Sequence, residues 1–193
     1  MVGPTAIGKT AIAIEIAKHL GCDIISADSR QFFKEMAIGT AKPTAEELAQ
    51  ANHHFVDFIS IHDSYTSGAF ENEAIQKIAK LHETNPFVVM AGGSGLYVNA
   101  VIKGIDDIPA DETLRAEIVK ELESEGIEKL QAELKERDPE HFERMDIHNP
   151  QRLIRAIEVC RLTGKTYSSF RRQKPKPRSF QVISIGLEAD REL

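Results

Sequence analysis

A glycine-rich segment near the amino end, GPTAIGKT, constrains the fold of this chain more than any other feature. It runs from Gly3 to Thr10 and fits the pattern G-x-x-x-x-G-K-[ST] at every fixed position. In this pattern the glycines let successive backbone amides point at one anion, and the helix that follows adds its positive amino end. Residues 1–2 are apolar like the end of a strand, and residues 10–20 have helical apolar spacing. The sequence therefore predicts a phosphate-binding loop between a strand and a helix.

The side chains of this loop predict what it binds. Lys9 supplies a positive charge for terminal phosphates, and the Thr10 hydroxyl is placed to ligate Mg²⁺. A glycine-rich turn without a ligand would not need Lys-Thr at the start of the helix. The loop alone does not name the reaction, because nucleotide hydrolysis, phosphoryl transfer and departure of diphosphate all use such a cradle. The predicted diphosphate-binding residues are Gly3, Pro4, Thr5, Ala6, Ile7, Gly8, Lys9 and Thr10.

Strand, turn and helix alternate over the first hundred residues, which indicates an α/β core with a parallel sheet. The first helix carries an apolar stripe at Ile12, Ile16 and Leu20. The continuous apolar run 87–91 is typical of a strand that is buried on both faces. The expected strands are 23–27, 55–61, 87–91 and 180–187, and the expected helices are 10–20, 69–83 and one that begins at 96.

The pattern changes after Pro109, where residues 111–162 read as helix throughout. Asn149-Pro150 is an N-cap followed by proline at the first helical position, and Gly164 closes that helix. Prolines among basic residues at 173–178 indicate a linker. We therefore predict an α/β core made of residues 1–108 and 180–193, interrupted by a helical insertion at 109–179.

Charge is distributed unevenly along the chain. The protein has 24 basic and 30 acidic residues, a net charge of −6, whereas residues 147–180 hold nine basic residues and one acidic residue, Glu158. A basic block inside an acidic protein indicates a local nucleic-acid site. A solvated helix face that runs into a charged loop would give the same count.

Composition also excludes several classes of protein. No apolar run approaches the ~18 residues that a membrane span needs, and no secretory signal is visible. Cys22 and Cys160 are too few and too far apart in sequence for a disulfide framework or a zinc site. We expect a cytoplasmic protein without a membrane partner.

Candidate catalytic and binding residues come directly after the expected strands 23–27 and 87–91. Asp28 ends one of them, where ligands of open parallel sheets bind, and its carboxylate could hold Mg²⁺ through water or accept a proton. A helix N-cap without chemistry is the alternative. Residues 92–95 (GGSG) end the next strand on the same edge, and Ser94 could donate to a phosphate. In the basic block, Gln151 and Arg155 lie one helical turn apart on one face of the expected helix. Glutamine and arginine contact bases or phosphates in RNA sites, and an ordinary solvent-exposed face is the alternative.

Five segments occur in one order and spacing along the chain: Gly3–Thr10, Asp28–Gln31 (DSRQ), Gly39–Pro43 (GTAKP), Gly92–Tyr97 (GGSGLY) and Asn149–Ala156 (NPQRLIRA). Together they resemble the tRNA dimethylallyltransferase family, whose members prenylate an adenine next to the anticodon. The GTAKP segment favours the tRNA enzymes over related enzymes that prenylate adenylate. The resemblance implies a P-loop kinase-like parallel-sheet core with an inserted helical domain that grips the anticodon stem-loop.

The resemblance also implies roles for particular residues. Dimethylallyl diphosphate would lie in the loop with Mg²⁺ at Thr10, Thr5 would contact the diphosphate near the scissile bond, and Asp28 would accept a proton from the adenine amine. We expect a monomer. The positions that contact tRNA in the family correspond here to Asp28, Ser29, Arg30, Gln31, Ser94, Arg115, Gln151, Arg152, Leu153, Ile154 and Arg155.

Some positions depart from the family pattern. Phe32-Phe33, Glu35 and Ala37 replace an aliphatic residue followed by Tyr, a Gly and an Asp, beside the segment implied to contact tRNA. Family members also continue past this carboxyl end, where a further arginine would help to hold the diphosphate, and the first strand is short. We therefore expect a fragment that is weakly active or inactive by itself. The alternatives are a P-loop small-molecule or nucleotide kinase and a non-catalytic RNA-binding module.

Overall fold

The computed structural model describes residues 1–4, 7–106, 108–171 and 174–188. Its contacts divide the chain into two compact units. Unit 1 comprises Met1–Ile105 and Pro175–Leu193, and unit 2 comprises Asp106–Lys174. The division therefore lies near residues 106 and 174, where the sequence predicts 109 and 179.

Unit 1 contains a small parallel sheet in the order β2-β1-β3. Strand β1 (Ile24–Ser26) is central, β2 is His53–His54 and β3 is Val89–Ala91. All three residues of β1 are buried, as expected for a parallel strand that is covered on both faces. The predicted strand 23–27 is thus confirmed in its central residues, and the predicted strand 87–91 is confirmed in its last three.

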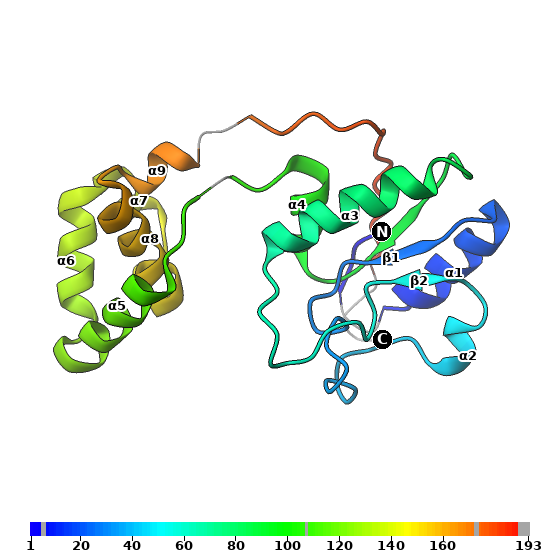
Figure 1. Ribbon diagram of the computed structural model, residues 1–193, viewed down its shortest axis with the longest axis horizontal. Coiled ribbons are helices and arrows are strands. Elements are labelled where there is room, and N and C mark those ends of the chain that lie inside the picture. Colours follow the sequence, from blue (N-terminus) through cyan, green and yellow to red (C-terminus); the bar gives the residue numbers. More distant parts are fainter. Residues whose placement is uncertain (5–6, 107, 172–173, 189–193) are drawn as a thin grey trace. The chain divides into compact units, whose positions relative to one another are not determined.

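Two further segments continue the sheet beyond β3. The Met1 amine donates to the Met90 carbonyl at 2.6 Å, and Val2 forms a parallel bridge with Gly186. Hydrogen bonds from Val2 N to the Ile185 carbonyl (3.0 Å) and from Leu187 N to the Val2 carbonyl (2.9 Å) complete this pairing. In Figure 1 the returning segment, drawn in red, reaches the amino terminus. Only this part of the predicted strand 180–187 pairs, and Ile183 is exposed.

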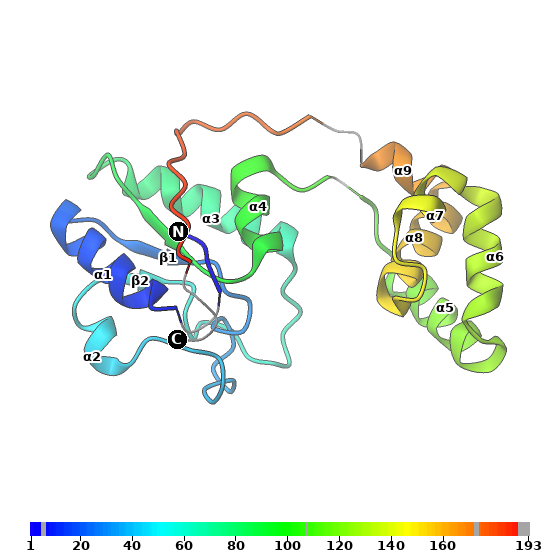
Figure 2. The same cartoon turned by 180° about the vertical axis from the view of Figure 1, so that it is seen from behind.

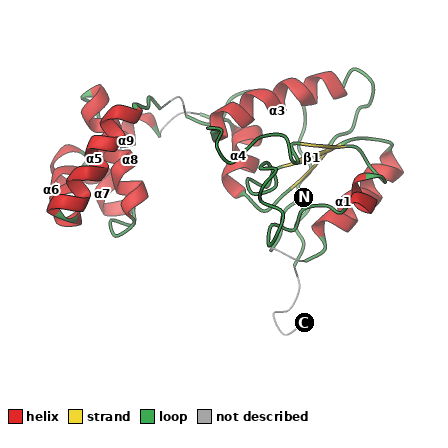
Figure 3. Cartoon of the chain, turned by 60° about the horizontal axis from the view of Figure 1, so that its bottom comes forward, coloured by secondary structure: helices red, strands yellow, loops and turns green. Residues whose placement is uncertain are grey.

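Helices cover both faces of the strands in unit 1. Helices α3 (Ser67–Leu81) and α4 (Gly95–Lys103) lie on one side and α1 (Lys9–Leu20) on the other (Figure 3). Because side chains alternate along a strand, Ile25 packs into the core with α3 and α4, whereas its neighbour Ile24 packs with α1.

The core on the α3 and α4 side is aromatic. Phe32 is fully buried there and stacks on Phe70, with their ring centroids 5.1 Å apart. Its edge-to-face neighbours are Phe58, Tyr65 and Tyr97. Phe32, one of the residues that depart from the family pattern, therefore fills the core. Glu35, another departure, accepts hydrogen bonds from the Ser60 hydroxyl and the Ile61 amide on the neighbouring loop.

One predicted strand of unit 1 is largely wrong, and one short helix has no counterpart among the predictions. The expected strand 55–61 is reduced to an isolated parallel bridge between Ile59 and Phe33. Phe55 and Asp57 have positive φ angles of 64° and 51°, so the chain turns directly after β2. The short helix α2 (Ala45–Leu48), which begins in a capping box between Thr44 and Glu47, was not expected. Both segments are set by local turns that interrupt the apolar pattern.

Unit 2 is a bundle of α5 (Glu112–Glu125), α6 (Ile127–Arg137), α7 (Pro139–Arg144), α8 (Pro150–Thr163) and α9 (Tyr167–Phe170) (Figure 2). The predicted helical character of residues 111–162 is confirmed. Asn149 caps α8 by accepting from the Arg152 amide at 3.2 Å, and Gly164 closes it with a φ of 68°. Ile118, Leu130 and Leu153 are fully buried in the core of this unit.

None of the helices in the described part of the chain has the length and apolar content needed to cross a membrane. Cys22 and Cys160 are free thiols, each buried in the core of its own unit. Burial raises the pKa of both thiols.

Candidate active site

The predicted phosphate loop leads directly into α1. Gly8 occupies the N-cap position with a φ of 89°, a left-handed conformation that favours glycine. Among the described residues no side chain caps this helix, and its first turn holds no acidic residue. The amides of the first turn are therefore directed at whatever anion the loop holds.

Lys9 folds back over the loop. Its Nζ donates to the carbonyls of Gly3 (2.9 Å) and Pro4 (2.5 Å), which places the ammonium group against the loop backbone. Gly3 also lies against the returning segment, where a Cβ atom would come within 2.8 Å of the Leu187 carbonyl oxygen. The predictions for Thr5 and Ala6 lie outside the described residues.

The loops that follow β1 and β3 are bonded to each other. Ser29 N donates to the Ser94 hydroxyl at 3.0 Å, and the two hydroxyl oxygens are 3.1 Å apart. Ser94 N donates to the Ala27 carbonyl at 3.3 Å. A Cβ on Gly92 would lie 2.3 Å from the Ala27 carbonyl oxygen, so this contact requires glycine. Two of the predicted RNA-binding residues, Ser29 and Ser94, are thus brought together.

Asp28 stands at the end of β1 on the same edge. Its Oδ1 accepts from the Arg30 amide at 3.1 Å, which fixes the carboxylate in a turn and not at the start of a helix. The structure therefore does not support the N-cap alternative. Arg30 itself is exposed. Asp28 lines a cavity at this edge of the sheet, where its carboxylate can act on a ligand.

A cavity of about 300 Å³ opens at this edge of the sheet. Its lining combines the end of the phosphate loop with the carboxylate and with a lysine from the GTAKP segment. The residues that matter for its chemistry are Gly8, Lys9, Thr10, Asp28, Lys42 and Gly92. The site therefore has cations and helix amides for an anion and, beside them, the Asp28 carboxylate for a proton or a metal-bound water. Glu47 also lines the cavity, but its carboxylate accepts from the Thr44 amide in the capping box of α2.

The oxygen donors of this cavity are compatible with Mg²⁺. The described residues contain no group of three or more His, Cys, Asp and Glu side chains that could hold a metal by themselves. Mg²⁺ in phosphate sites keeps several waters and takes only one or two protein oxygens besides the phosphates. The Thr10 hydroxyl and the Asp28 carboxylate both line the cavity and provide such oxygens.

Gln31 and Lys42 shape this cavity from its other side. Gln31 is buried, accepts from the Ser26 hydroxyl at 2.8 Å and donates to the Ala41 carbonyl at 2.8 Å. The amide oxygen of Gln31 is thus bonded to β1, and its nitrogen holds the 39–43 segment. Lys42 donates to the Phe33 carbonyl (2.6 Å) and pairs with Asp57. Lys42 is not among the site residues predicted from the sequence. Its position inside the GTAKP motif is the signal that could have indicated it.

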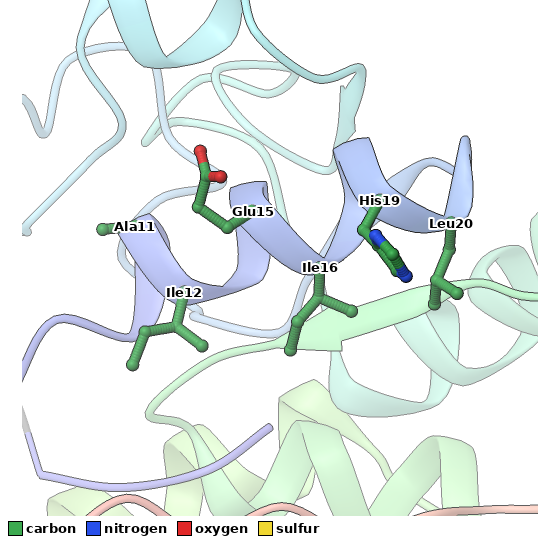
Figure 4. A pocket seen from close by; sticks show the side chains of 6 residues that line it. All are labelled: Ala11, Ile12, Glu15, Ile16, His19 and Leu20. Atoms are coloured by element: carbon green, nitrogen blue, oxygen red, sulfur yellow. The ribbon is translucent and has the colours of Figure 1, made fainter.

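A second cavity, of about 460 Å³, lies along the outer face of α1. Figure 4 shows Ile12, Ile16 and Leu20 pointing to one side of this helix, with Glu15 on another. This stripe is not the buried face, because Ile12 is 40% exposed and α1 buries Ala13, Ile14 and Ala17 instead. The groove is mostly apolar, and its two titratable side chains, Glu15 and His19, are exposed on the surface of the helix.

Unit 2 brings together several of the predicted RNA-binding residues. Arg115 Nη2 donates to the Gln151 side chain at 3.2 Å, and Arg155 Nη2 donates to the Ile108 carbonyl at 3.0 Å. Gln151 and Arg152 are exposed at the start of α8. These polar residues thus form one cluster on this unit.

The prediction that Leu153 and Ile154 contact tRNA is corrected by their burial. The resemblance implies that they contact tRNA, but their exposed fractions are 0% and 1%. Both pack in the core between α8 and its neighbouring helices, as Ile157 and Cys160 do. Fully buried side chains cannot reach RNA while the bundle stays packed, so we assign them to the core.

Comparison with known proteins identifies the family. The family model described as IPP transferase matches residues 31–193. A tRNA dimethylallyltransferase from Christiangramia forsetii is 52% identical over 194 residues, which cover 100% of this chain and 64% of that protein. One from Flavobacterium johnsoniae is also 52% identical, over 100% of this chain and 65% of that protein. The chain thus spans just under two thirds of the length of these relatives.

Solved structures give the same result. A tRNA delta(2)-isopentenylpyrophosphate transferase from Staphylococcus epidermidis matches 99% of this chain and 63% of its own, at 32% identity and a TM-score of 0.58. A eukaryotic dimethylallyltransferase acting on tRNA matches 93% of this chain at 22% identity and a TM-score of 0.71, which supports the fold. The predicted P-loop α/β core with helices is therefore confirmed, and the chain belongs to the IPP transferase family.

Proposed function

We propose that this chain carries the catalytic site that transfers a dimethylallyl group from dimethylallyl diphosphate to the exocyclic N6 of an adenosine next to the anticodon of tRNA, with release of diphosphate. The observation that carries the proposal is the cavity at the sheet edge, where Lys9 and Thr10 line the same space as Asp28. An anion cradle beside the Asp28 carboxylate suits a reaction in which diphosphate leaves while an amine attacks. Family membership supports the same reaction.

The loop would act on the leaving group. An exocyclic amine is a poor nucleophile, so the rate depends on stabilising the departing diphosphate and on positioning the reactants. Lys9 and the first-turn amides of α1 lie where this negative charge would gather. Mg²⁺, held through Thr10, would neutralise part of the diphosphate charge when bound.

Asp28 would act on the acceptor. Its carboxylate is fixed by the Arg30 amide and lines the cavity, so it can orient the adenine amine and take the proton that the amine loses. The proton passes from the amine nitrogen to Asp28, while the bond between the allylic carbon and the diphosphate oxygen breaks and the carbon–nitrogen bond forms.

RNA recognition would use both units. Ser29, Arg30 and Ser94 lie beside the cavity edge, and the cluster on α8 offers Arg115, Gln151, Arg152 and Arg155 to phosphates and bases. The target adenine must leave its stack to reach a cavity in the core, and helical units recognise folded RNA loops through their shape. We place this reaction in the cytoplasm and on a monomer.

The test is a single-turnover reaction with the chain in excess over tRNA, so that even slow transfer is measured. The tRNA is digested after incubation with dimethylallyl diphosphate and Mg²⁺, and its nucleosides are analysed for prenylated adenosine. Titration calorimetry compares the affinities of dimethylallyl diphosphate and ATP. We expect prenylated adenosine and preferential binding of the prenyl diphosphate. A chain that binds ATP and phosphorylates a small acceptor, while tRNA stays unmodified, would instead be a kinase.

A further inference from the structure

Glu158 is the one acidic residue in the basic block 147–180, and the structure places it in the interior of unit 2. It lies on α8 with a side chain that is only 1% exposed. Its Oε1 accepts from the Asp111 amide at 2.9 Å, at the start of α5. A buried carboxylate is stable only when it has charged or polar partners, so its neighbours indicate its role.

Two arginines surround the other oxygen of this carboxylate. Arg155 Nη1 lies 2.9 Å from Glu158 Oε2, and Arg115 Nη1 lies 3.9 Å from the same atom. Neither Arg155 Nη1 nor Glu158 Oε2 has a hydrogen-bond partner of good geometry in the part of the chain that the structure describes. The pair is therefore held by charge, with its geometry imposed by the helices.

The Nη2 atoms of both arginines also make hydrogen bonds. Arg155 Nη2 donates to the Ile108 carbonyl, and Arg115 Nη2 donates to Gln151. The side chains of Arg115 and Arg155 remain 43% and 26% exposed, so each can still offer donors to an outside anion. Three residues that the proposed function assigns to RNA thus form one network around a single buried carboxylate.

We propose that Glu158 is a positioning residue for RNA binding, which holds Arg115 and Arg155 in the orientation that receives phosphate oxygens. This inference rests on the proposed function of the chain. A free arginine side chain must give up its rotamer freedom when it binds a phosphate, and a pre-oriented one has less freedom to lose. Two guanidinium groups and one carboxylate leave a net positive charge, which still attracts RNA.

The proposal makes a prediction opposite in sign to that of simple electrostatics. If Glu158 acted only as a negative charge near an RNA surface, then its neutralisation would tighten RNA binding. If it orients the arginines, its neutralisation weakens binding. In the Glu158→Gln variant one amide nitrogen must face either the Asp111 amide or Arg155, both of which are donors.

The experiment measures binding of a fluorescently labelled anticodon stem-loop RNA to the chain over a range of salt concentrations. For Glu158→Gln we expect roughly tenfold weaker binding and a salt slope reduced by about one, as for the loss of a phosphate contact. Affinity for dimethylallyl diphosphate should not change, because its proposed residues lie in unit 1. Glu123→Gln, which removes an exposed charge from α5, is the matched control and should bind RNA at least as well as the wild type.

Each outcome bears on a different claim. A wild-type chain that does not bind the stem-loop overturns the proposed function. A wild-type chain that binds, with Glu158→Gln binding equally or more tightly, overturns only the positioning role. If Glu158→Gln does not fold, as judged by circular dichroism, Arg155→Lys gives the answer. Lysine keeps the charge but cannot reach Glu158 and Ile108 with two arms, so weaker binding supports positioning and unchanged binding contradicts it.

Discussion

Arg178 Nη2 donates to the Glu71 carboxylate at 2.8 Å, and this pair joins the two ends of unit 1 that border the helical insertion. Glu71, buried on α3, also accepts from the Ile105 amide at 2.7 Å and from Lys176 Nζ at 3.1 Å. Ile105 is the last residue before the insertion, and Lys176 is the second residue after it. One carboxylate thus anchors both the departing and the returning chain.

Glu71→Gln should destabilise unit 1 and change its response to acid. Burial raises the pKa of Glu71, but its donors from Arg178, Ile105 and Lys176 outweigh burial and hold the pKa below 4.5. A carboxylate whose folded pKa is depressed stabilises the fold above its unfolded pKa, and this contribution is lost as pH falls through the folded value. We expect a loss of about 2 kcal/mol at neutral pH, the size of a hydrogen bond to a charged group.

The measurement is thermal unfolding between about pH 3 and about pH 7. The gap between wild type and Glu71→Gln should close at the acid end, and Glu83→Gln, an exposed change just after α3, should follow the wild type throughout. A gap that stays constant with pH would show that ionisation of Glu71 does not contribute.

Gly92→Ala should disrupt the cavity edge. The new Cβ would lie 2.3 Å from the Ala27 carbonyl oxygen, and backbone on both sides would have to move. We expect a loss of about 3 kcal/mol or failure to fold, as in severe overpacking. Gly95→Ala is the matched control, because its Cβ would meet no atom within 4 Å of the described structure and alanine favours the helix. Chemical denaturation of both variants measures the difference, and equal stabilities would refute the close approach.

Lys9→Met should separate diphosphate binding from RNA binding. The variant keeps the length of the side chain but removes the charge that lies at the loop. We expect affinity for dimethylallyl diphosphate to fall by about 100-fold, because charge-assisted contacts to phosphate are strong. Binding of the anticodon stem-loop should stay within about twofold, since Lys9 is not among the residues proposed to contact RNA. An unchanged affinity for the diphosphate in calorimetry would place the anion site outside this loop.

Asp28→Asn should slow prenyl transfer without preventing binding. The amide can still occupy the turn with Arg30 but cannot accept a proton. A positioned base contributes roughly 10²-fold to a rate, so we expect a loss of that size in single-turnover transfer. Affinities for dimethylallyl diphosphate and for the stem-loop, measured in parallel, should change little. Undiminished transfer would remove Asp28 from the mechanism.

Arg161→Ala should destabilise unit 2. Arg161 bridges Glu121 on α5 (2.8 Å) and Glu133 on α6 (2.6 Å), and it lowers the pKa of both carboxyl groups. Its loss would leave two carboxylates facing each other in a partly buried site, which we expect to destabilise the unit by about 2 kcal/mol. Arg144→Ala, at an exposed pair within α7, should change stability by at most about 0.5 kcal/mol. Equal unfolding midpoints for these two variants would contradict the bridge.

The local pattern of the sequence was sufficient for the elements that depend on short-range rules. The turn at Gly8 that leads into α1 follows from a fixed glycine, and the ends of α8 follow from Asn149, Pro150 and Gly164, because caps and turns involve neighbouring residues. The alternation of strand and helix likewise predicted the α/β core. The strand at 55–61 failed for a local reason as well, since the positive φ angles at Phe55 and Asp57 have no glycine to signal them.

The sequence by itself thus determined the glycine turn into α1, the alternation of strands and helices and the family, because each depends on short motifs of neighbouring residues. Only the tertiary structure decided which face of α1 is buried, that Leu153 and Ile154 belong to a core, and that Glu158 lies between two arginines. These facts depend on contacts between residues far apart in sequence. Helical spacing says which side chains share a face, but the packing partner decides which face is covered.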